Sequence, residues 1–296
     1  MKFTTSFYSF SYQGQRDYQQ DALFPQGEDQ QNNAQLIFAV CDGMGGTEQG
    51  EVASQSVVKT IGGVHLALSS NQVLRPSVLS TFLSQAYNQL DVDGKNIDTG
   101  TTLAMLWLHA GGCAMVHLGD SRVYQFRQGR GIVYRSKDHS LVNELVEAHV
   151  ITPEEALHHS KRNVITRCME PATQNRRRDK ATAFFTADIQ KGDIFLICSD
   201  GVTGEVDDGS LVRLLLAQGR LEDKLATIAA FCENAADNAT AILVEVEQVE
   251  RGNGEVDAEP QMLEIDAEEP DSHISDSLKN GGITHFFQRI MDNLFN

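Results

Sequence analysis

Hydrophobic and polar positions fall into blocks that predict both strands and helices. Ser6 to Tyr12 places aromatic residues between polar ones, and an apolar run from Leu36 stops at Asp42, so each is a predicted strand. Gln49 to Leu68 and Val73 to Leu90 carry apolar residues at helical spacing. The first third of the chain therefore predicts two strands and two long helices.

A closely spaced group of strand candidates follows. Glycine-containing turn sequences separate them, which predicts an antiparallel meander. The four candidates are Thr101 to Leu108, Cys113 to Leu118, Arg122 to Phe126 and Gly131 to Arg135. Later strands are expected at Ala183 to Thr186, Ile194 to Cys198 and Ala239 to Val246.

Short helices complete the pattern. They are expected at Leu141 to Ala148, Pro153 to His158, Ser210 to Ala217 and Leu221 to Asn234. Thr152 is placed to cap the second of these, with Pro153 at its first position. Because strands come in runs and helices in pairs, the sequence predicts an α+β fold rather than a series of βαβ units.

The composition changes after about Gln248. From Glu245 to Asp276 there are twelve acidic residues and one basic residue, Arg251. We therefore expect a domain over residues 1–248 and an acidic disordered linker over residues 249–277. The last segment, 278–296, places seven apolar residues on one face of a predicted helix. That amphipathic C-terminal helix either docks on the domain or binds a partner, and its few cations make a membrane surface the weaker alternative.

Charge and cysteine content narrow the class of protein. The net charge of −17 argues against nucleic acid as a partner, because phosphate backbones select basic surfaces. No stretch is long and apolar enough for a transmembrane segment, and the N-terminus lacks the apolar core of a signal peptide. The five cysteines form no metal-like pair. These features predict a cytoplasmic location.

Four short phrases containing aspartate stand out as candidate chemistry. They are Gln20-Asp21, Asp42-Gly43-Met44-Gly45-Gly46, Ser199-Asp200-Gly201 and Asp237-Asn238. Two of them follow apolar strand candidates, so their carboxylates are expected at strand ends. Converging carboxylates repel one another unless cations lie between them. A glycine such as Gly43 also lets a backbone carbonyl approach a cation closely. Oxygen donors favour magnesium or manganese over zinc, so the leading hypothesis is a metal-dependent enzyme.

Through these four motifs and three others, the chain resembles the metal-dependent protein serine/threonine phosphatases of type 2C, in their compact bacterial form. Seven elements occur in the family's order across roughly residues 5–248, and together they are far more specific than any one alone. The elements are Arg16-Asp17-Tyr18-Gln19-Gln20-Asp21, Asp42-Gly43-Met44-Gly45-Gly46, Gly100-Thr101-Thr102, Gly119-Asp120-Ser121-Arg122, Lys137-Asp138-His139, Ser199-Asp200-Gly201 and Asp237-Asn238-Ala239-Thr240.

The resemblance implies an architecture and a set of metal ligands. The expected fold is a four-layer α-β-β-α sandwich with two antiparallel sheets flanked by helix pairs. Asp42 would bridge two cations, with the Gly43 carbonyl at the second site. Asp200 and Asp237 would hold the first cation. Asp120 would help to hold a third, although a simple hairpin turn is the other interpretation of its position between two strand candidates.

The remaining roles concern substrate and chemistry. By resemblance, Arg16 would bind the substrate phosphate, while Gln20 and Asp21 would support the metal site. Two or three Mn²⁺ or Mg²⁺ ions would generate a metal-bridged hydroxide that attacks phosphorus in line, without a phosphoenzyme. Substrates would be phosphorylated proteins, and a serine/threonine kinase would be the opposing partner. Animal relatives carry glutamate where this chain has neutral Gln20, so a catalytically weak sensor acting through the tail helix stays as the alternative.

Overall fold

The computed structural model describes residues 1–26, 36–45, 49–67, 72–95, 97–172, 178–251 and 259–267. Its strands are β1 (Lys2–Tyr12), β2 (Asp21–Phe24), β3 (Ile37–Gly45), β4 (Thr99–Thr101), β5 (Leu103–His109), β6 (Gly112–Leu118), β7 (Arg122–Arg127), β8 (Gly131–Arg135), β9 (Ala181–Thr186), β10 (Ile194–Cys198), β11 (Ala239–Glu250) and β12 (Gln261–Ile265). Its helices are α1 (Gln49–Ala67), α2 (Pro76–Asp93), α3 (Leu141–Glu147), α4 (Pro153–Leu157), α5 (Asp200–Glu205), α6 (Asp208–Leu215) and α7 (Leu221–Cys232).

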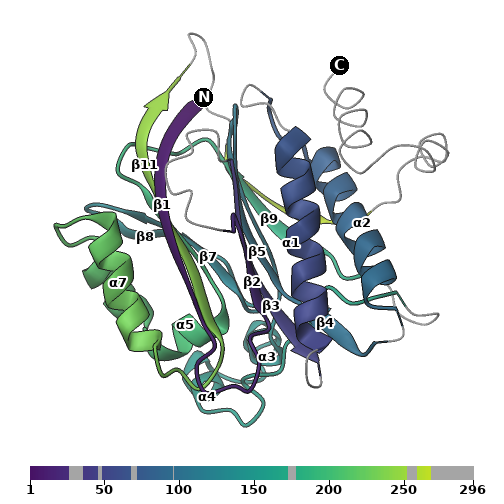
Figure 1. The fold of residues 1–296 in the computed structure, drawn as a ribbon. Helices are drawn as coiled ribbons and strands as arrows, with labels where there is room; N and C mark the ends of the chain where they lie inside the picture. Colours follow the sequence, from purple (N-terminus) through teal and green to yellow (C-terminus); the bar gives the residue numbers. More distant parts are fainter. Residues whose placement is uncertain are drawn as a thin grey trace.

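Two antiparallel sheets form the centre of the fold. One has the strand order β1-β11-β10-β7-β8, and the other runs β12-β9-β6-β5-β3-β2 with β4 paired to β3. Figure 1 shows α1 and α2 covering one sheet, with α5 and α7 on the outer side of the other. The predicted α+β class and four-layer sandwich are therefore confirmed. One detail differs, because α5 joins the expected pair α6 and α7 in the second helical layer.

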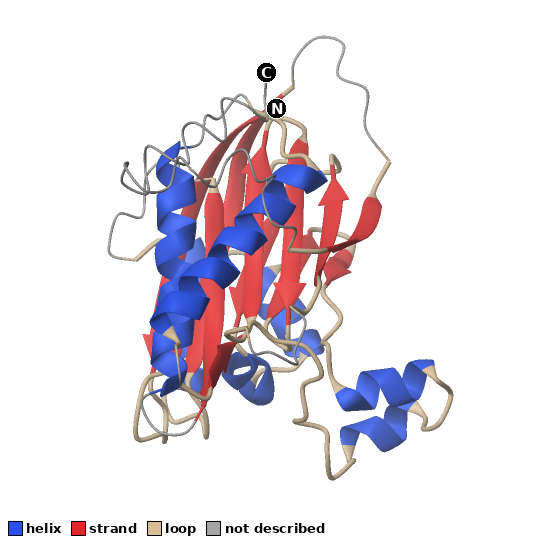
Figure 2. Ribbon diagram, turned by 90° about the vertical axis from the view of Figure 1, so that its right-hand side faces the viewer, coloured by secondary structure: helices blue, strands red, loops and turns tan. Residues whose placement is uncertain are grey.

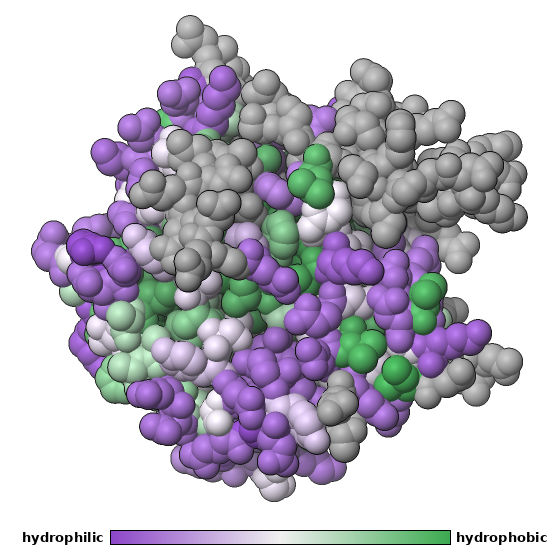
Figure 3. All heavy atoms as spheres, viewed as in Figure 1, coloured by the Kyte–Doolittle hydropathy of each residue, from purple (hydrophilic) through white to green (hydrophobic). Residues whose placement is uncertain are grey.

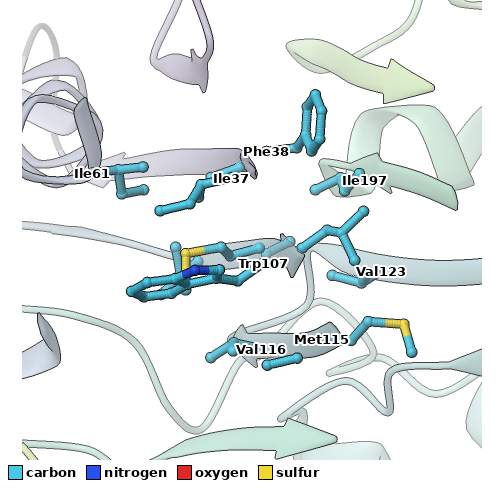
Figure 4. Close-up of a cluster of buried hydrophobic side chains, with 14 of the residues drawn as sticks. Ile37, Phe38, Ile61, Trp107, Met115, Val116, Val123 and Ile197 are labelled. Atoms are coloured by element: carbon cyan, nitrogen blue, oxygen red, sulfur yellow. The ribbon is translucent and has the colours of Figure 1, made fainter. Parts of the chain in front are cut away.

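Successive side chains of a strand point to opposite faces of its sheet. A single strand can therefore contribute both to the core between the sheets and to the core under a helical layer. In β10, Phe195 and Ile197 belong to the core between the sheets, whereas Leu196 packs with the helices α5 to α7. Figure 4 shows the same alternation in β3, where Ile37 points toward Ile61 of α1 and Phe38 points toward the opposite sheet. Such strands are buried on both faces and read as continuous apolar runs.

The predicted antiparallel meander is wrong as a single unit. β5 and β6 pair with each other in one sheet, while β7 and β8 pair in the other. The chain crosses between the sheets at Gly119-Asp120-Ser121, so Asp120 does not sit in a hairpin turn. Spacing between apolar runs cannot distinguish a hairpin from a crossover between stacked sheets, because both need only a short connection.

The short helices α3 and α4 pack on each other and stand apart from the sheets (Figure 2). The predicted cap of α4 is confirmed. The Thr152 hydroxyl accepts a hydrogen bond from the Glu155 N–H, and the Glu155 carboxylate accepts one from the Thr152 N–H. Pro153 occupies the first turn, where a missing N–H costs nothing.

The acidic linker contains a strand that the sequence did not predict. Residues 261–265 form β12, which pairs with β9 at the edge of its sheet. The expectation of disorder over residues 249–277 is therefore wrong for this stretch. Ile265 is buried and Leu263 packs on the core, so two apolar side chains anchor this segment. Its acidic neighbours give it the composition of a disordered linker. The predicted C-terminal helix over 278–296 lies outside the described residues.

The surface of the protein, its helices and its cysteines are each consistent with its composition. Polar residues cover most of the face seen in Figure 3, while apolar residues gather toward its middle. Within the described ranges, none of the helices is long and apolar enough to span a bilayer. All five cysteines are buried free thiols.

Candidate metal centre

Five aspartates from both sheets meet at one end of the sandwich. Asp42 lies in β3 directly opposite Asp21, the first residue of β2. Asp200 begins α5 just after β10 ends, and Asp237 precedes β11. Asp120 lies in the crossover between β6 and β7. The strand ends thus bring together carboxylates that are up to 216 residues apart in the chain, from Asp21 to Asp237.

Burial and mutual repulsion raise the pKa values of this cluster. Burial raises the pKa of Asp21 to about 7, and the charges of Asp200 and Asp237 add to the effect, although a hydrogen bond from Ser199 opposes it. Burial, reinforced by Asp200, raises the pKa of Asp120 to about 7. The pKa of Asp42 is raised well above its usual range, first by burial and then by Asp21. Carboxyls with raised pKa values near one another favour a shared cation.

Hydrogen bonding within the cluster is incomplete. The Ser199 hydroxyl donates to Asp21 Oδ2 at 2.8 Å. The other oxygen, Asp21 Oδ1, is buried without a hydrogen-bond partner, and Asp200 Oδ1 is too. A buried carboxylate oxygen without a donor is costly unless a cation or water completes it. Two such atoms at one site fit the donor set of a bound cation.

Arg16 lies at the open edge of the cluster. Its guanidinium Nη2 donates to Asp237 Oδ2 at 2.5 Å, and its side chain is 57% exposed. The hydrogen bond with Asp237 is the main cause that raises the pKa of Arg16, and the charges of Asp200 and Asp42 add to it. Arg16 is therefore an exposed, permanently charged guanidinium beside the carboxylates, where an anionic group would approach.

Asn238 ties the loop carrying Arg16 to the cluster, and the sequence assigned it no separate role. Its Nδ2 donates to the carbonyls of Gln13 and Tyr18 at 2.8 and 2.9 Å. Its Oδ1 accepts from the Gln20 N–H at 2.8 Å. One buried amide thus fixes both ends of the loop. Its position directly after Asp237 was the available signal, since an amide fits this triple contact better than any apolar residue.

The Gly-Thr-Thr motif joins two of the carboxylate-bearing segments. The Thr102 hydroxyl accepts from the Asp42 N–H at 3.0 Å and lies 2.6 Å from the Ser121 hydroxyl. The Thr102 N–H also donates to the Asp42 carbonyl at 2.9 Å. Thr102 therefore links the end of β3 to the crossover that carries Asp120. These bonds give a physical reason for a motif to which the sequence alone assigned no role.

Gly43 packs too tightly for any side chain. A Cβ at this position would lie 2.2 Å from the Gly50 carbonyl oxygen and 2.6 Å from that of Gln20. The Gly43 N–H donates to the same Gln20 carbonyl at 3.1 Å. The backbone of β3 is thus pressed against the start of α1 and the end of the loop before β2.

Replacing Gly43 by alanine is expected to destabilise the protein by about 1–3 kcal/mol, because backbone atoms must move to admit the methyl group. Metal-dependent activity should fall with it, since Asp42 is the neighbouring residue. Gly204→Ala is the matched control, because nothing lies within 4 Å of a Cβ there and alanine favours helix α5. Thermal melts of both variants, with and without Mn²⁺, check this expectation. An unaltered melt for Gly43→Ala would contradict this packing argument.

The donor set suits hard divalent cations. Carboxylate oxygens and a glycine carbonyl are the ligands that Mg²⁺ and Mn²⁺ prefer. As the side chains stand, no three or more histidine, cysteine, aspartate or glutamate groups in the described ranges are arranged to hold a metal ion. The ion pair of Asp237 with Arg16 and the bond of Asp21 to Ser199 draw two carboxylates toward protein partners.

Known proteins are similar to this chain over most of its length. The profile of the protein phosphatase 2C family matches residues 11–245. Protein phosphatase PhpP of Streptococcus pneumoniae is 31% identical over 221 residues, which cover 72% of this chain and 86% of that protein. The serine/threonine phosphatase Stp1 of Staphylococcus aureus is a structural neighbour with 29% identity and a TM-score of 0.69, covering 84% of this chain and 98% of that one.

A further structural neighbour bears on the fold alone. The catalytic domain of the phosphatase PstP, solved in complex with two manganese ions, has a TM-score of 0.67 and 24% identity. The alignment covers 83% of this chain and all of that domain. Matching architecture over the whole of a phosphatase domain agrees with the order of layers described above.

Proposed function

This chain belongs to the protein phosphatase 2C family and is a protein serine/threonine phosphatase, and from that premise we propose how its carboxylate cluster acts. The cluster holds two or three Mn²⁺ or Mg²⁺ ions and hydrolyses phosphoserine and phosphothreonine in proteins. The observation that carries this proposal is the convergence of five aspartates, two with buried oxygens that lack a hydrogen-bond partner. Bound ions of this kind supply an acidified water as nucleophile and neutralise charge on the phosphoryl group.

Each residue of the cluster has a proposed task. Asp42 would hold two of the ions, and the Gly43 carbonyl would contribute to the second site. Asp200 and Asp237 would hold the first ion, and Asp120 would help to hold the third. Asp21 lies opposite Asp42 in the β2–β3 pair, where its carboxylate would orient water at the site. Gln20 supports the site through its backbone, whose N–H and carbonyl bond to Asn238 and Gly43.

Arg16 binds the substrate phosphate in this proposal. Its planar fork matches two phosphate oxygens at once, which the compact ammonium group of lysine does not. The ion pair with Asp237 keeps Arg16 at the edge of the cluster. An ion held by Asp237 would weaken that pair and leave the guanidinium available to an incoming anion.

Water attacks phosphorus directly and in line, without a phosphoenzyme. Burial raises the pKa values of the Cys41 and Cys198 thiols beside the site, so neither supplies a thiolate nucleophile near neutral pH. Ser199 is fully buried and its hydroxyl is engaged with Asp21. These neighbours favour water over a protein side chain as the attacking group.

The opposing partner is a serine/threonine kinase, because phosphoserine and phosphothreonine in proteins arise by phosphoryl transfer. The alternative of a catalytically weak sensor is not favoured, since the named relatives are phosphatases. We retain the domain at residues 1–248 and the tail helix at 278–296 as proposals, with β12 added to the catalytic unit.

The decisive experiment uses phosphopeptides in ¹⁸O-labelled water. With Mn²⁺ present, phosphoserine and phosphothreonine peptides should release phosphate that carries one ¹⁸O atom from solvent, while a phosphotyrosine peptide should react far more slowly. Acid quenching during turnover should trap no ³²P on the protein. Labelled protein would overturn direct attack by water, and failure to hydrolyse any phosphopeptide with Mn²⁺ or Mg²⁺ would overturn the proposed activity.

A further inference from the structure

Strand β12 lies outside the segment shared with the family, yet it is built into the sheet. The family match ends at residue 245, and β12 pairs with β9 so that Glu264 faces Thr182 and Ile265 faces Ala181. Its C-terminal end is anchored twice. Lys180 Nζ forms an ion pair with Asp266 at 2.8 Å, and the Ser80 hydroxyl donates to the Asp266 carbonyl at 2.6 Å.

Glu264 ends a continuous chain of hydrogen bonds that starts at Gly119. The Gly119 N–H donates to His139 Nδ1 at 3.1 Å. Because Nδ1 accepts, the proton of the neutral ring sits on Nε2, which lies 3.0 Å from the Thr182 hydroxyl. The Thr182 hydroxyl donates to Glu264 Oε1 at 2.7 Å. Every donor in this relay has its acceptor, and the acceptor at the far end is the carboxylate from β12.

His139 holds Gly119 from two sides. Besides the contact to its ring, the His139 backbone N–H donates to the Gly119 carbonyl at 2.9 Å. Gly119 itself has φ of +103°, and a Cβ there would lie 2.6 Å from Thr102 Cγ2. Only glycine adopts this backbone conformation without strain, and only glycine fits against Thr102, so the clamp acts on a position that no other residue type can fill. Asp120 is the next residue, so the orientation of its carboxylate depends on this clamp.

The second oxygen of Glu264 bonds to the segment that returns from α4. Arg167 Nη1 lies 2.6 Å from Glu264 Oε2. The neighbouring Thr166 N–H donates to the His139 carbonyl at 2.8 Å. One carboxylate therefore joins β12, β9, the His139 loop and the base of the projecting α3–α4 pair.

From these contacts we propose that Glu264 is a positioning residue for the phosphatase reaction, acting through Thr182 and His139 on the turn that presents Asp120. It would make the affinity for the third ion depend on a strand supplied by the chain's own acidic tail. This inference rests on the proposed role of Asp120 as a ligand of that ion. Glu264 itself touches neither substrate nor metal.

Removing the terminal acceptor should weaken metal binding without abolishing catalysis. In full-length Glu264→Ala, the Mn²⁺ concentration for half-maximal hydrolysis of p-nitrophenyl phosphate is expected to rise about tenfold, the lower range for loss of an outer partner of a metal ligand. The rate at saturating Mn²⁺ should stay near that of the unaltered protein. Titration calorimetry with Mn²⁺ should show the same loss for the weakest ion. Glu264→Gln should restore the normal value, because its amide oxygen still accepts from Thr182.

Asp266→Ala is the matched control, because it removes a carboxylate of similar exposure just after the end of β12 and breaks an ion pair without cutting the relay. It should leave Mn²⁺ dependence unchanged. Thr182→Val cuts the relay one step earlier and should reproduce the effect of Glu264→Ala. The double variant Glu264→Ala/Thr182→Val should bind Mn²⁺ no more weakly than either single variant, since both substitutions remove the same chain of hydrogen bonds.

A readout without metal separates this inference from the proposed activity. In metal-free protein, NMR of the His139 ring nitrogens and the Gly119 amide should shift in Glu264→Ala and Thr182→Val but not in Asp266→Ala. Unchanged Gly119 and His139 signals in Glu264→Ala would overturn the relay, whatever the enzyme assay shows. An equal loss of Mn²⁺ affinity in Asp266→Ala would also overturn it, because docking of β12 alone would then explain the effect.

Discussion

Replacing Asp200 by asparagine is expected to abolish measurable Mn²⁺-dependent hydrolysis of p-nitrophenyl phosphate. Asparagine keeps the shape and can still begin α5, but it removes a negative charge from the centre of the cluster. The loss should exceed the roughly 10- to 100-fold that follows when only an outer partner of a metal ligand is removed. Steady-state kinetics over a range of Mn²⁺ concentrations measure it, and high Mn²⁺ should not restore the rate.

The same variant should be more stable than the unaltered protein when metal is absent. Burial and the charge of Asp237 raise the pKa of Asp200, which means that its ionised form is disfavoured in the folded state. Asp207→Asn is the matched control. Asp207 caps α6 through its side chain, and asparagine caps a helix equally well, so activity and melting should stay unchanged. Normal turnover in Asp200→Asn would remove this residue from the metal site.

Metal-free protein is expected to lose stability as the pH rises from about 5.5 to 8. The folded-state pKa of Asp21 is about 7, against about 3.9 for an unfolded aspartate. Because the folded state binds this proton more tightly, its stabilising contribution is complete below the unfolded pKa and disappears as the pH rises through the folded one. Asp120 behaves in the same way, with its pKa also raised to about 7.

For Asp21, which is almost fully buried, the loss over this interval is on the order of 2 kcal/mol. The melting temperature of chelator-treated protein should therefore fall by roughly 4–8 °C. Saturating Mn²⁺ should reverse the trend, because cations bind the ionised carboxylates and compete with protons. Scanning calorimetry at several pH values, with chelator or with Mn²⁺, measures both effects. Asp21→Asn should shrink the pH dependence, and a metal-free melting temperature that stays flat or rises across this interval would refute the argument.

Much of the proposed metal site could be predicted from the sequence because its signals are local. An apolar run that ends in Asp-Gly predicts a carboxylate at a strand terminus, which is confirmed for Asp200, just after β10, and wrong for Asp42, because β3 continues to Gly45. The helix cap at Thr152 was equally predictable, since both of its hydrogen bonds form within four residues. The order of the seven motifs along the chain then matched these local signals to the pattern of one family.

The sequence failed where one pattern fits two tertiary arrangements. The turn-like spacing around Asp120 suits a hairpin as well as a crossover, and only the pairing of β7 with β10 decides between them. β12 was hidden because its acidic and polar neighbours Glu259, Gln261, Glu264 and Asp266 outweigh Leu263 and Ile265 in composition. Its position depends on an open edge of β9, and nothing within residues 259–267 reveals that edge.

By itself, then, the sequence determined the α+β class, most of the strands and the aspartates that belong to the family's pattern, because periodicity and short motifs are properties of neighbouring residues. Only the tertiary structure decided which of those residues share one environment. Raised pKa values in Asp21, Asp42 and Asp120 need both burial and like charges from distant segments. The relay from Gly119 to Glu264 needs four segments at hydrogen-bond distance. Burial and contact between remote segments are created by folding, so no local pattern encodes them.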